Sequence, residues 1–513
     1  MSGPQSGAGD GDGVPQDPVA GSAAGSVPGS FTARPGLSPV PTPLRVAYGL
    51  GSMAEGTKDT LFNIFLLFYY HSVLGLSGAL AGLAIFLALC LDAVTDPLLG
   101  AISDRTRSRW GRRHPWMYAS VVPLALAIVA LAAPPEGLSQ AALFGWLLGF
   151  AVLARQGMTL YAVPSNAMLP ELTPHYDERT EIVGLRFLFG WLAGLSVAVL
   201  GYTVFFAEQP GGVDGRLDPA AWPAFGAFCA VVAVAGVLIC AGGTHRAIGR
   251  LATPPAGPLR PRALLGDVRE VLGSKPFRPL LWAALCSAAG WGYINATSLY
   301  INTWYWGLSS QAIGGLTLGI FVSVFIAAGA APGLAAMSDK RTVAVKLSLF
   351  ALVFGPLPLL LRLLGWFPEN GTRELFAALL LHTIILFAAL IAISIITASM
   401  IADLADWSEA THGRRHEGVF AAVMAFVIKA TSGLGTLGAG LMLELIGLEA
   451  STAALQGADA AAGGAPASAA LNALGGAVAL GISLLFALSV WFLSRYPLTR
   501  ERFAALRPQA ESA

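Results

Sequence analysis

Eight charged residues lie inside long apolar stretches of the sequence, where a charge is hardest to accommodate. A charged side chain at the centre of a membrane costs at least ~2.5–3.5 kcal/mol, and such residues usually face a water-filled pathway and pair with one another. Four acids and four bases permit near-neutral clusters. They are Glu55, Asp59, Asp92, Asp96, Lys58, Arg155, Arg186 and Lys429.

Asp92 and Asp96 have the spacing that places two carboxylates on one face of a helix. Such a pair can supply hard oxygen ligands to a small cation, including Na+, and Thr95 adds a possible oxygen. Alternatively, one carboxyl group holds a proton, because two like charges in a poorly solvated place favour protonation of one of them. The competing interpretation is a structural ion-pair network with Lys429 or Arg186.

Lys58 and Asp59 are consecutive, so their side chains point about 100° apart on a helix and are not expected to pair directly. Asp59 and Arg186 would suit a polyol, because a carboxylate accepts hydrogen bonds from hydroxyl groups and a guanidinium donates to them. In the alternative interpretation, both residues are structural counter-charges.

Trp291 lies near Tyr293 and Asn295, and this aromatic and polar face either stacks on a sugar ring or packs between helices. His382 is expected to be a packed, hydrogen-bonded histidine, with a proton relay as the alternative. Asp104 and the arginines that follow it are expected to form a latch between helix ends or a positive anchor.

The elements that must hold these residues are membrane helices. Hydrophobic residues make up 55% of the 513 residues and charged residues 12%, against roughly 25% charged in soluble proteins. A helix needs about 20 apolar residues to cross the bilayer core. Twelve stretches qualify: 44–71, 78–103, 115–133, 139–168, 180–206, 222–244, 277–305, 310–337, 343–364, 373–402, 418–446 and 471–494.

The distribution of Lys and Arg predicts the orientation of these spans. With the N-terminus inside, 24 of the 31 Lys and Arg fall in inside segments. We therefore expect a plasma membrane protein, of a bacterial inner membrane, with both termini cytoplasmic. Residues 1–43 are predicted to be a disordered tail, 245–276 a cytoplasmic linker and 495–513 a cytoplasmic tail. The net charge of +1 indicates no nucleic-acid partner.

The two halves, 44–244 and 277–494, resemble each other weakly. Leu74-Gly-Leu-Ser77 recurs as Trp306-Gly-Leu-Ser309, and Asn63 pairs with Asn295 at the same offset of 232. Two such six-helix bundles describe the major facilitator fold. Asp92 and Asp96 correspond to Ala327 and Ala331 in the second half. The repeat therefore folds without these acids, which favours a functional role for them.

Several motifs together make the sequence resemble the glycoside–pentoside–hexuronide:cation symporter family, the melibiose permease relatives. The resemblance covers residues 44–500. The motifs are Gly56-Thr-Lys58-Asp59, Asp92-Ala-Val-Thr-Asp96-Pro97, Arg107-Ser-Arg-Trp-Gly-Arg-Arg-His-Pro-Trp116, Pro164-Ser-Asn-Ala-Met-Leu-Pro-Glu171, Tyr176-Asp-Glu-Arg179, Arg186-Phe, Asp403-Leu-Ala-Asp406-Trp, Gly413-Arg-Arg-His-Glu-Gly418 and Lys429.

The resemblance implies roles for particular residues. Asp92 and Asp96 match cation-site aspartates, Thr159 matches a cation-site threonine, and Lys429 matches a lysine beside the cation. Lys58, Asp59 and Arg186 match positions that contact the sugar. Rocking of the two halves by alternating access is implied as well.

The sequence also departs from the melibiose permease pattern. Aligned through Pro164, the fourth-helix aspartate shared by cation and sugar becomes Ala162, and the tryptophan that stacks on the sugar becomes Asn166. The missing acid favours a proton over sodium as the coupling ion. Asn166 and Trp291 complete the expected solute site. Arg155 has no family counterpart and either offsets an acid or contacts an anionic solute such as a uronide.

The expected function is symport of a cation, H+ or Na+, with a sugar or glycoside. The alternative on the same fold is a lysolipid or another amphiphilic or anionic solute. We expect no cofactor, a monomer surrounded by membrane lipid, and no enzymatic activity, because no nucleophile with a base and no metal-ligand cluster falls at membrane depth. A non-transporting sensor would need a signalling domain, and the sequence suggests none.

Overall fold

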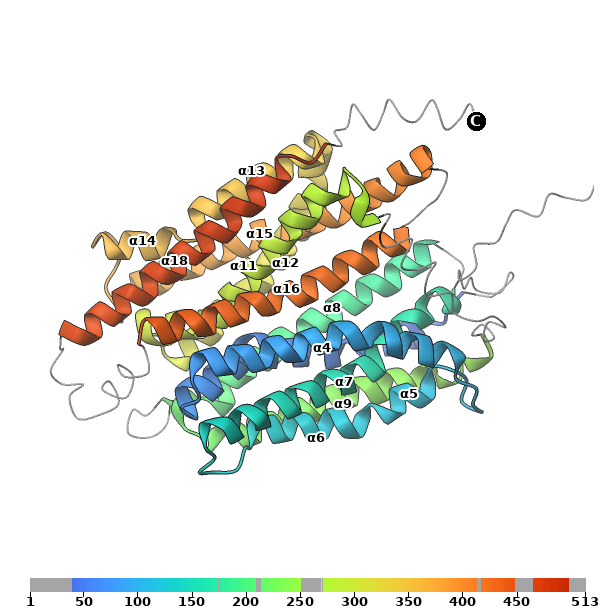
Figure 1. Ribbon diagram of the computed structural model, residues 1–513, viewed down its shortest axis with the longest axis horizontal. Helices are drawn as coiled ribbons and strands as arrows, with labels where there is room; N and C mark the ends of the chain where they lie inside the picture. The colour runs from blue at the N-terminus through green and yellow to red at the C-terminus, as the bar shows by residue number, and fades with distance from the viewer. Residues whose placement is uncertain are drawn as a thin grey trace, which may run out of the picture.

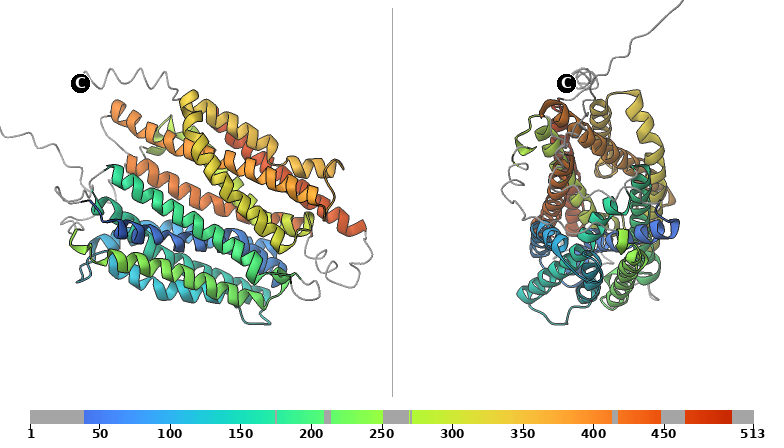
Figure 2. Two further views of the ribbon diagram at one scale, coloured as in Figure 1. Left: turned by 180° about the vertical axis from the view of Figure 1, so that it is seen from behind. Right: turned by 90° about the vertical axis from the view of Figure 1, so that its right-hand side faces the viewer.

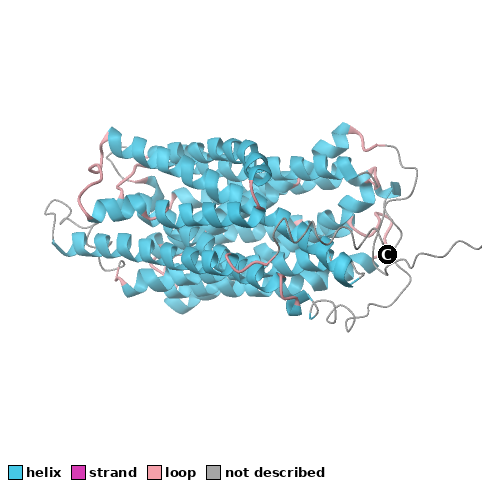
Figure 3. Ribbon diagram, turned by 90° about the horizontal axis from the view of Figure 1, so that it is seen from above, coloured by secondary structure: helices cyan, strands magenta, loops and turns pink. Residues whose placement is uncertain are grey.

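The computed structural model describes residues 39–173, 176–208, 214–250, 269, 271–412, 417–447 and 465–497. Within those residues every regular element is a helix, and most helices run along the long axis of the molecule (Figure 3). The prediction of an all-α polytopic protein is confirmed. Most of the predicted linker and both predicted tails, apart from residues 39–43 and 495–497, lie outside the described residues.

The helices form two bundles that lie side by side, each made from one half of the chain (Figures 1 and 2). The N-terminal bundle contains α1 (Thr42–Leu50), α2 (Ser52–Thr60), η1 (Leu61–Phe65), α3 (Leu66–Phe68), η2 (Tyr69–Val73), α4 (Gly78–Arg105), α5 (His114–Ala119), α6 (Val121–Ala132), α7 (Gln140–Leu172), α8 (Tyr176–Leu200), η3 (Gly201–Phe205), η4 (Gly215–Leu217), α9 (Ala221–His245) and η5 (Ile248–Arg250).

The C-terminal bundle is built from the second half of the chain. It contains α11 (Phe277–Tyr300), η6 (Ile301–Tyr305), α12 (Ser310–Met337), α13 (Lys340–Phe354), α14 (Leu357–Leu363), α15 (Arg373–His412), α16 (Glu417–Leu445) and α18 (Ala465–Leu493).

Ten of the described helices are long and apolar enough to cross a membrane. The other two predicted spans are the tract 42–73 and α11. The first is divided into short α- and π-helical pieces, and α11 carries Asn295, Thr297 and Ser298, which lower its mean hydropathy. With these two helical tracts, the described residues contain helical structure at each of the twelve predicted spans.

The internal repeat is visible in the backbone. The π-helices η2 and η6 begin at Tyr69 and Ile301, which are 232 residues apart, and each is followed by a glycine of positive φ, Gly75 (71°) and Gly307 (60°). Only glycine adopts that conformation without strain, so it ends both helices in the same way. The offset of 232 found in the sequence is therefore an offset between equivalent structures.

The two bundles pack against each other mainly at one end. We call this the outer end, as the charge pattern predicts. It carries the connecting residues 74–77, 133–139, 206–208, 214–220, 306–309 and 364–372. A continuous apolar core joins the N-terminal bundle to the outer half of the C-terminal bundle. A separate cluster around Phe277, Met400 and Tyr496 fills the inner half of the C-terminal bundle alone. In Figure 1 the ribbons of α4 and α16 converge at the outer end and diverge toward the other.

Glycines allow α4 and α16 to approach this closely. A Cβ atom on Gly78 would lie 2.7 Å from the Gly440 carbonyl oxygen, and one on Gly440 would lie 2.1 Å from the Gly78 oxygen. Small residues at a crossing let membrane helices come into backbone contact. This contact fixes the register of α16 against α4, and so it decides which side chains of the two bundles meet further along.

Candidate functional site

Asp92 and Asp96 lie one turn apart on α4, and their carboxylates are turned toward α7 and α16. Asp92 is buried, with 3% of its surface exposed, whereas the Asp96 side chain is 25% exposed. Pro97 follows directly inside α4, and the helix continues through it. The predicted one-face arrangement of the two acids is therefore present in the structure.

Thr159 of α7 joins the two carboxylates. Its hydroxyl oxygen lies 2.7 Å from Asp92 Oδ1 and 2.8 Å from Asp96 Oδ1. A hydroxyl group has one hydrogen, so it can donate fully to only one of these oxygens. The hydroxyl group therefore links the two carboxylates and holds α7 against α4 at this level.

Lys429 reaches the same pair from α16 in the opposite bundle. Its Nζ atom lies 2.6 Å from Asp96 Oδ2 and 3.2 Å from Asp92 Oδ2. The Lys429 side chain is 42% exposed, so this ion pair borders solvent-accessible space. The site therefore spans the interface of the two bundles, and the network weighed as an alternative to cation binding is formed with Lys429 and not with Arg186.

Arg155 also belongs to this cluster, where it offsets Asp92, one of the two roles that the sequence left open for it. It lies on α7 one turn before Thr159, with one guanidinium nitrogen 3.5 Å from Asp92 Oδ2. The group is 4% exposed and its Cζ lies 4.8 Å from the Phe62 ring centroid. Arg155 and Thr159 have the same spacing in the sequence as Asp92 and Asp96. This equal spacing was the signal that could have placed Arg155 beside the acids.

Thr95 does not face the carboxylate oxygens in this structure. Its hydroxyl donates to the Leu91 carbonyl at 3.0 Å, with the Asp92 carbonyl at 3.2 Å, and accepts from Gln156 Nε2 at 2.8 Å. Gln156, a neighbour of Arg155 on α7, is a residue that the sequence did not single out. Thr95 thus ties α4 to α7 and leaves Thr159 as the hydroxyl at the acids.

The expectation that Lys58 and Asp59 do not pair is wrong. Lys58 Nζ lies 2.7 Å from Asp59 Oδ1 on α2. The flexible four-carbon stem of lysine bends back to its neighbour, which the direction of the Cβ atoms alone does not reveal. Lys58 is nearly buried at 10% exposure of its side chain, whereas Asp59 is 58% exposed and remains open to a visiting molecule.

Arg186 of α8 is held by α1 and α2 and not by Asp59. Its nitrogens donate to Ser52 Oγ at 3.1 Å, Tyr48 Oη at 3.0 Å and Glu55 Oε1 at 3.0 Å. The Arg186 side chain is 10% exposed. Glu55, found in the sequence as an unassigned acid, is therefore the partner of the arginine expected to bind solute.

The two remaining predicted solute residues lie in different bundles. Asn166 is exposed on α7. Trp291 of α11 is partly buried, and its ring meets Phe387 edge to face at a centroid distance of 5.7 Å. The structure thus gives Trp291 the packing role that was weighed against sugar stacking, and it leaves the contact of both residues with solute a prediction.

A buried network closes the other end of the N-terminal bundle. Glu171 of α7 is fully buried and binds both Arg112 and Arg113. Arg113 also contacts Asp104 at 2.5 Å. The predicted connection between Asp104 and the arginines after it is present, and Glu171 is the acid at its centre.

Among the polar contacts that join the bundles at the outer end, two are made by charged side chains. Arg216 of η4 donates to Thr303 Oγ1 at 2.9 Å and to the Leu308 carbonyl at 2.8 Å. Glu444 of α16 accepts from Ser77 Oγ at 2.8 Å and from the Ala79 N–H at 3.1 Å, so it caps the first turn of α4. Both contacts must break before the outer end can open.

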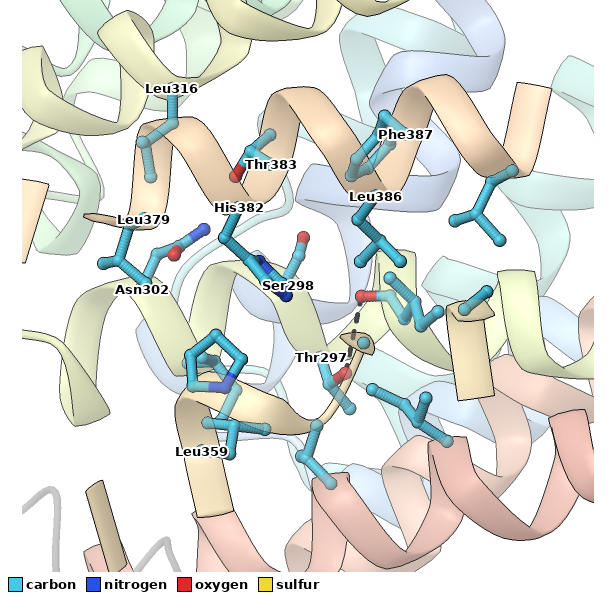
Figure 4. A pocket seen from close by; sticks show the side chains of 18 of the residues that line it. Thr297, Ser298, Asn302, Leu316, Leu359, Leu379, His382, Thr383, Leu386 and Phe387 are labelled. Atoms are coloured by element: carbon cyan, nitrogen blue, oxygen red, sulfur yellow. Dashed lines mark hydrogen bonds between the residues drawn. The ribbon is translucent and has the colours of Figure 1, made fainter. Parts of the chain in front are cut away.

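A cavity of about 150 Å³ lies inside the C-terminal bundle (Figure 4). Its wall is mostly apolar, with polar groups from Ser298, Asn302, His382 and Thr383. His382 donates from Nε2 to the Phe354 carbonyl at 2.8 Å. That carbonyl lacks its helical partner because the residue four positions on is Pro358, which has no N–H. The packed, hydrogen-bonded histidine is confirmed.

Comparison with known proteins agrees with this architecture. The chain matches the family model described as MFS/sugar transport protein over residues 47–500. It is 34% identical over 171 residues to an uncharacterized symporter of Synechocystis, an alignment that covers 32% of this chain and 31% of that protein. It is 22% identical to the isoprimeverose transporter of Lactiplantibacillus pentosus, over 81% of this chain and 82% of that one.

Among solved structures, a D-xylose–proton symporter superposes with a TM-score of 0.60 at 14% identity. The superposition covers 89% of this chain and 98% of that one. At this identity the likeness establishes the fold, with two bundles of membrane helices.

Proposed function

Because this chain belongs to the MFS/sugar transport protein family, we propose that it is a secondary active transporter that couples transport of a sugar or glycoside to symport of a cation. The transport cycle is alternating access, in which the bundles rock about the solute. We place the basic inner end and both termini in the cytoplasm on the strength of the charge bias, and we propose a monomer in a bacterial inner membrane.

One observation carries the proposal: two carboxylates of the N-terminal bundle are bridged by a lysine of the C-terminal bundle. When the bundles rock, Lys429 must leave Asp92 and Asp96, and the carboxylates then need another positive charge. An uncompensated charge in this poorly solvated place is costly. Arrival of a cation therefore stabilises the state in which Lys429 has moved, which links the cation to the conformational change.

The coupling ion that we favour is the proton. Among the described residues, Thr159 supplies the hydroxyl group within 2.8 Å of both carboxylates, and a proton, unlike a metal ion, needs no further oxygen ligands there. The missing fourth-helix acid at Ala162 also reduces the number of oxygens available to sodium. We assign the solute to the space beside Asp59, whose exposed carboxylate can accept hydrogen bonds from sugar hydroxyls.

Uptake into vesicles under separate proton and sodium gradients tests the proposal. Solute accumulation should follow the proton gradient, and Asp96→Asn or Asp92→Asn should abolish accumulation while solute counterflow persists. The matched control is Glu374→Gln, an exposed acid at the start of α15 that should change neither. Accumulation that ignores both gradients, or that is complete in both aspartate variants, contradicts cation coupling.

The solute class has its own assay, because it is independent of the coupling ion. Purified protein is heated with a panel of glycosides and uronides and with a panel of lysolipids. A glycoside that raises the melting temperature, with loss of that effect in Asp59→Asn, supports the assignment. If only lysolipids raise the melting temperature, the sugar assignment is wrong and the solute is amphiphilic.

A further inference from the structure

Arg155 occupies a position that a mobile cation would otherwise take. Arg155 and Thr159 are one turn apart on α7. They face Asp92 and Asp96, which are one turn apart on α4, so two side chains of each helix meet in one cluster. Arg155 is 4% exposed, which leaves it no access to a solute in solvent. Its Nε atom has no hydrogen-bond partner among the described residues. The described surroundings of Arg155 therefore balance its charge, but they do not accept a hydrogen bond from every N–H group of the guanidinium.

The two cations at the carboxylates differ in which bundle carries them. Lys429 comes from the opposite bundle and moves away when the bundles rock. Arg155 belongs to the same bundle as Asp92, and α4 and α7 pack along their lengths, so Arg155 stays. Once Lys429 has gone, two carboxylates face one guanidinium, and the deficit is a single positive charge. Lys58 and Asp59 on α2 pair with each other and add no net charge.

The oxygens left for a metal ion are few. Asp92 Oδ2 is turned toward Arg155, and the Thr95 hydroxyl is used by the Leu91 carbonyl and Gln156. A hard cation needs several oxygen ligands in one shell. A guanidinium about 5 Å from such an ion lowers its affinity on the order of 100-fold at an effective dielectric constant of about 20.

We propose that Arg155 is a resident counter-cation for Asp92 that excludes sodium from the carboxylate pair. The inference rests on the proposed cation coupling and identifies the residue that selects the ion. It predicts that removal of the charge at position 155 creates a sodium site, because Asp92 then regains both of its oxygens for a metal ion and the repulsion disappears.

Binding of radioactive sodium to the purified, reconstituted protein tests this directly. The wild type should show no saturable sodium binding, and Arg155→Gln should gain affinity on the order of 100-fold. Arg155→Lys, which keeps the charge, should behave like the wild type. The charge-matched double variant Arg155→Gln/Asp92→Asn should not gain the site, because it lacks one of the two carboxylates. A role in folding alone would not produce this pattern.

The inference is overturned if the wild type binds sodium saturably, or if folded Arg155→Gln gains no affinity. Should Arg155→Gln fail to fold, the wild type still decides: a rise in its melting temperature with sodium but not with choline would refute the inference. Vesicle uptake that ignores every cation would refute the proposed coupling, while the sodium-binding measurements would still judge Arg155.

Discussion

Replacement of Arg216 by alanine should open the outer end of the molecule. Arg216 is 2% exposed and donates to Thr303 Oγ1 and the Leu308 carbonyl, both in the opposite bundle. Asp214, in its own bundle, accepts from Arg216 Nε at 2.8 Å and orients the guanidinium. Both cross-bundle bonds exist only while the outer end is closed, so their loss destabilises that state alone.

The size of the effect follows from these two bonds. A hydrogen bond from a charged donor contributes roughly 1.5–3 kcal/mol. Water that solvates the freed acceptors recovers part of this free energy, so we take about 3 kcal/mol as the combined loss for the two hydrogen bonds. Since 1.4 kcal/mol is a factor of ten, the equilibrium between closed and open outer ends should shift about 100-fold toward the open state.

Electron paramagnetic resonance distances between spin labels measure this shift. The labels are attached to Glu136→Cys and Glu369→Cys, exposed positions in outer connections of the two bundles, with the four native cysteines replaced. The parent should give mainly the short distance of the closed end. The Arg216→Ala variant should populate a longer distance as a major fraction.

Two further variants decide whether the reasoning holds. Arg362→Ala is the matched control, because Arg362 donates only to the Phe367 and Pro368 carbonyls of its own bundle among the described contacts. It should leave the distances unchanged. Thr303→Val, which removes one bond, should shift the equilibrium about tenfold in the same direction. An unchanged distribution in Arg216→Ala, or an equal change in the Arg362 control, would refute the reasoning.

Two predictions concern stability. Glu171→Gln should lower the free energy of unfolding by roughly 3–5 kcal/mol, because it leaves buried arginines without their carboxylate. Glu181 forms an exposed ion pair, so Glu181→Gln should lower the free energy of unfolding by at most about 1 kcal/mol. Denaturant titrations that give equal losses for the Glu171 and Glu181 variants would contradict the argument. His382→Phe should cost about 1–3 kcal/mol by leaving the Phe354 carbonyl unpaired. Pro358→Ala in the same chain should restore part of that loss in melting experiments by supplying an N–H; no restoration would refute the assigned role.

The fold could be predicted from the sequence in some detail. Apolar stretches set the spans, and the offset of 232 identified equivalent turns at Gly75 and Gly307. The orientation that the Lys and Arg bias indicates stays a prediction. Within the candidate site, the sequence predicted that Asp92 and Asp96 share one helix face, because helical periodicity fixes the relative directions of residues in the same helix. The resemblance to the symporter family supplied Thr159 and Lys429 as their neighbours.

The partners of the other charges were not predictable in this way. Helical periodicity fixes directions within one helix, but contacts between helices depend on their rotation and register. Arg155 meets Asp92 because α7 packs on α4 in one rotation, and Glu55 takes Arg186 because of the way α8 lies on α2. Lys58 reaches Asp59 through a bent side chain, a conformation that only its surroundings select.

By itself, therefore, the sequence determined that this is a twofold-repeated membrane protein with acids on one inward helix face, because apolar length, charge bias and periodicity are local properties. The tertiary structure decided that Arg155 of the same bundle neutralises Asp92 and that Asp92 and Asp96 share Lys429 of the opposite bundle. Close packing at glycines such as Gly78 and Gly440 fixes how the bundles meet, and a contact between residues hundreds of positions apart exists only after that packing is complete.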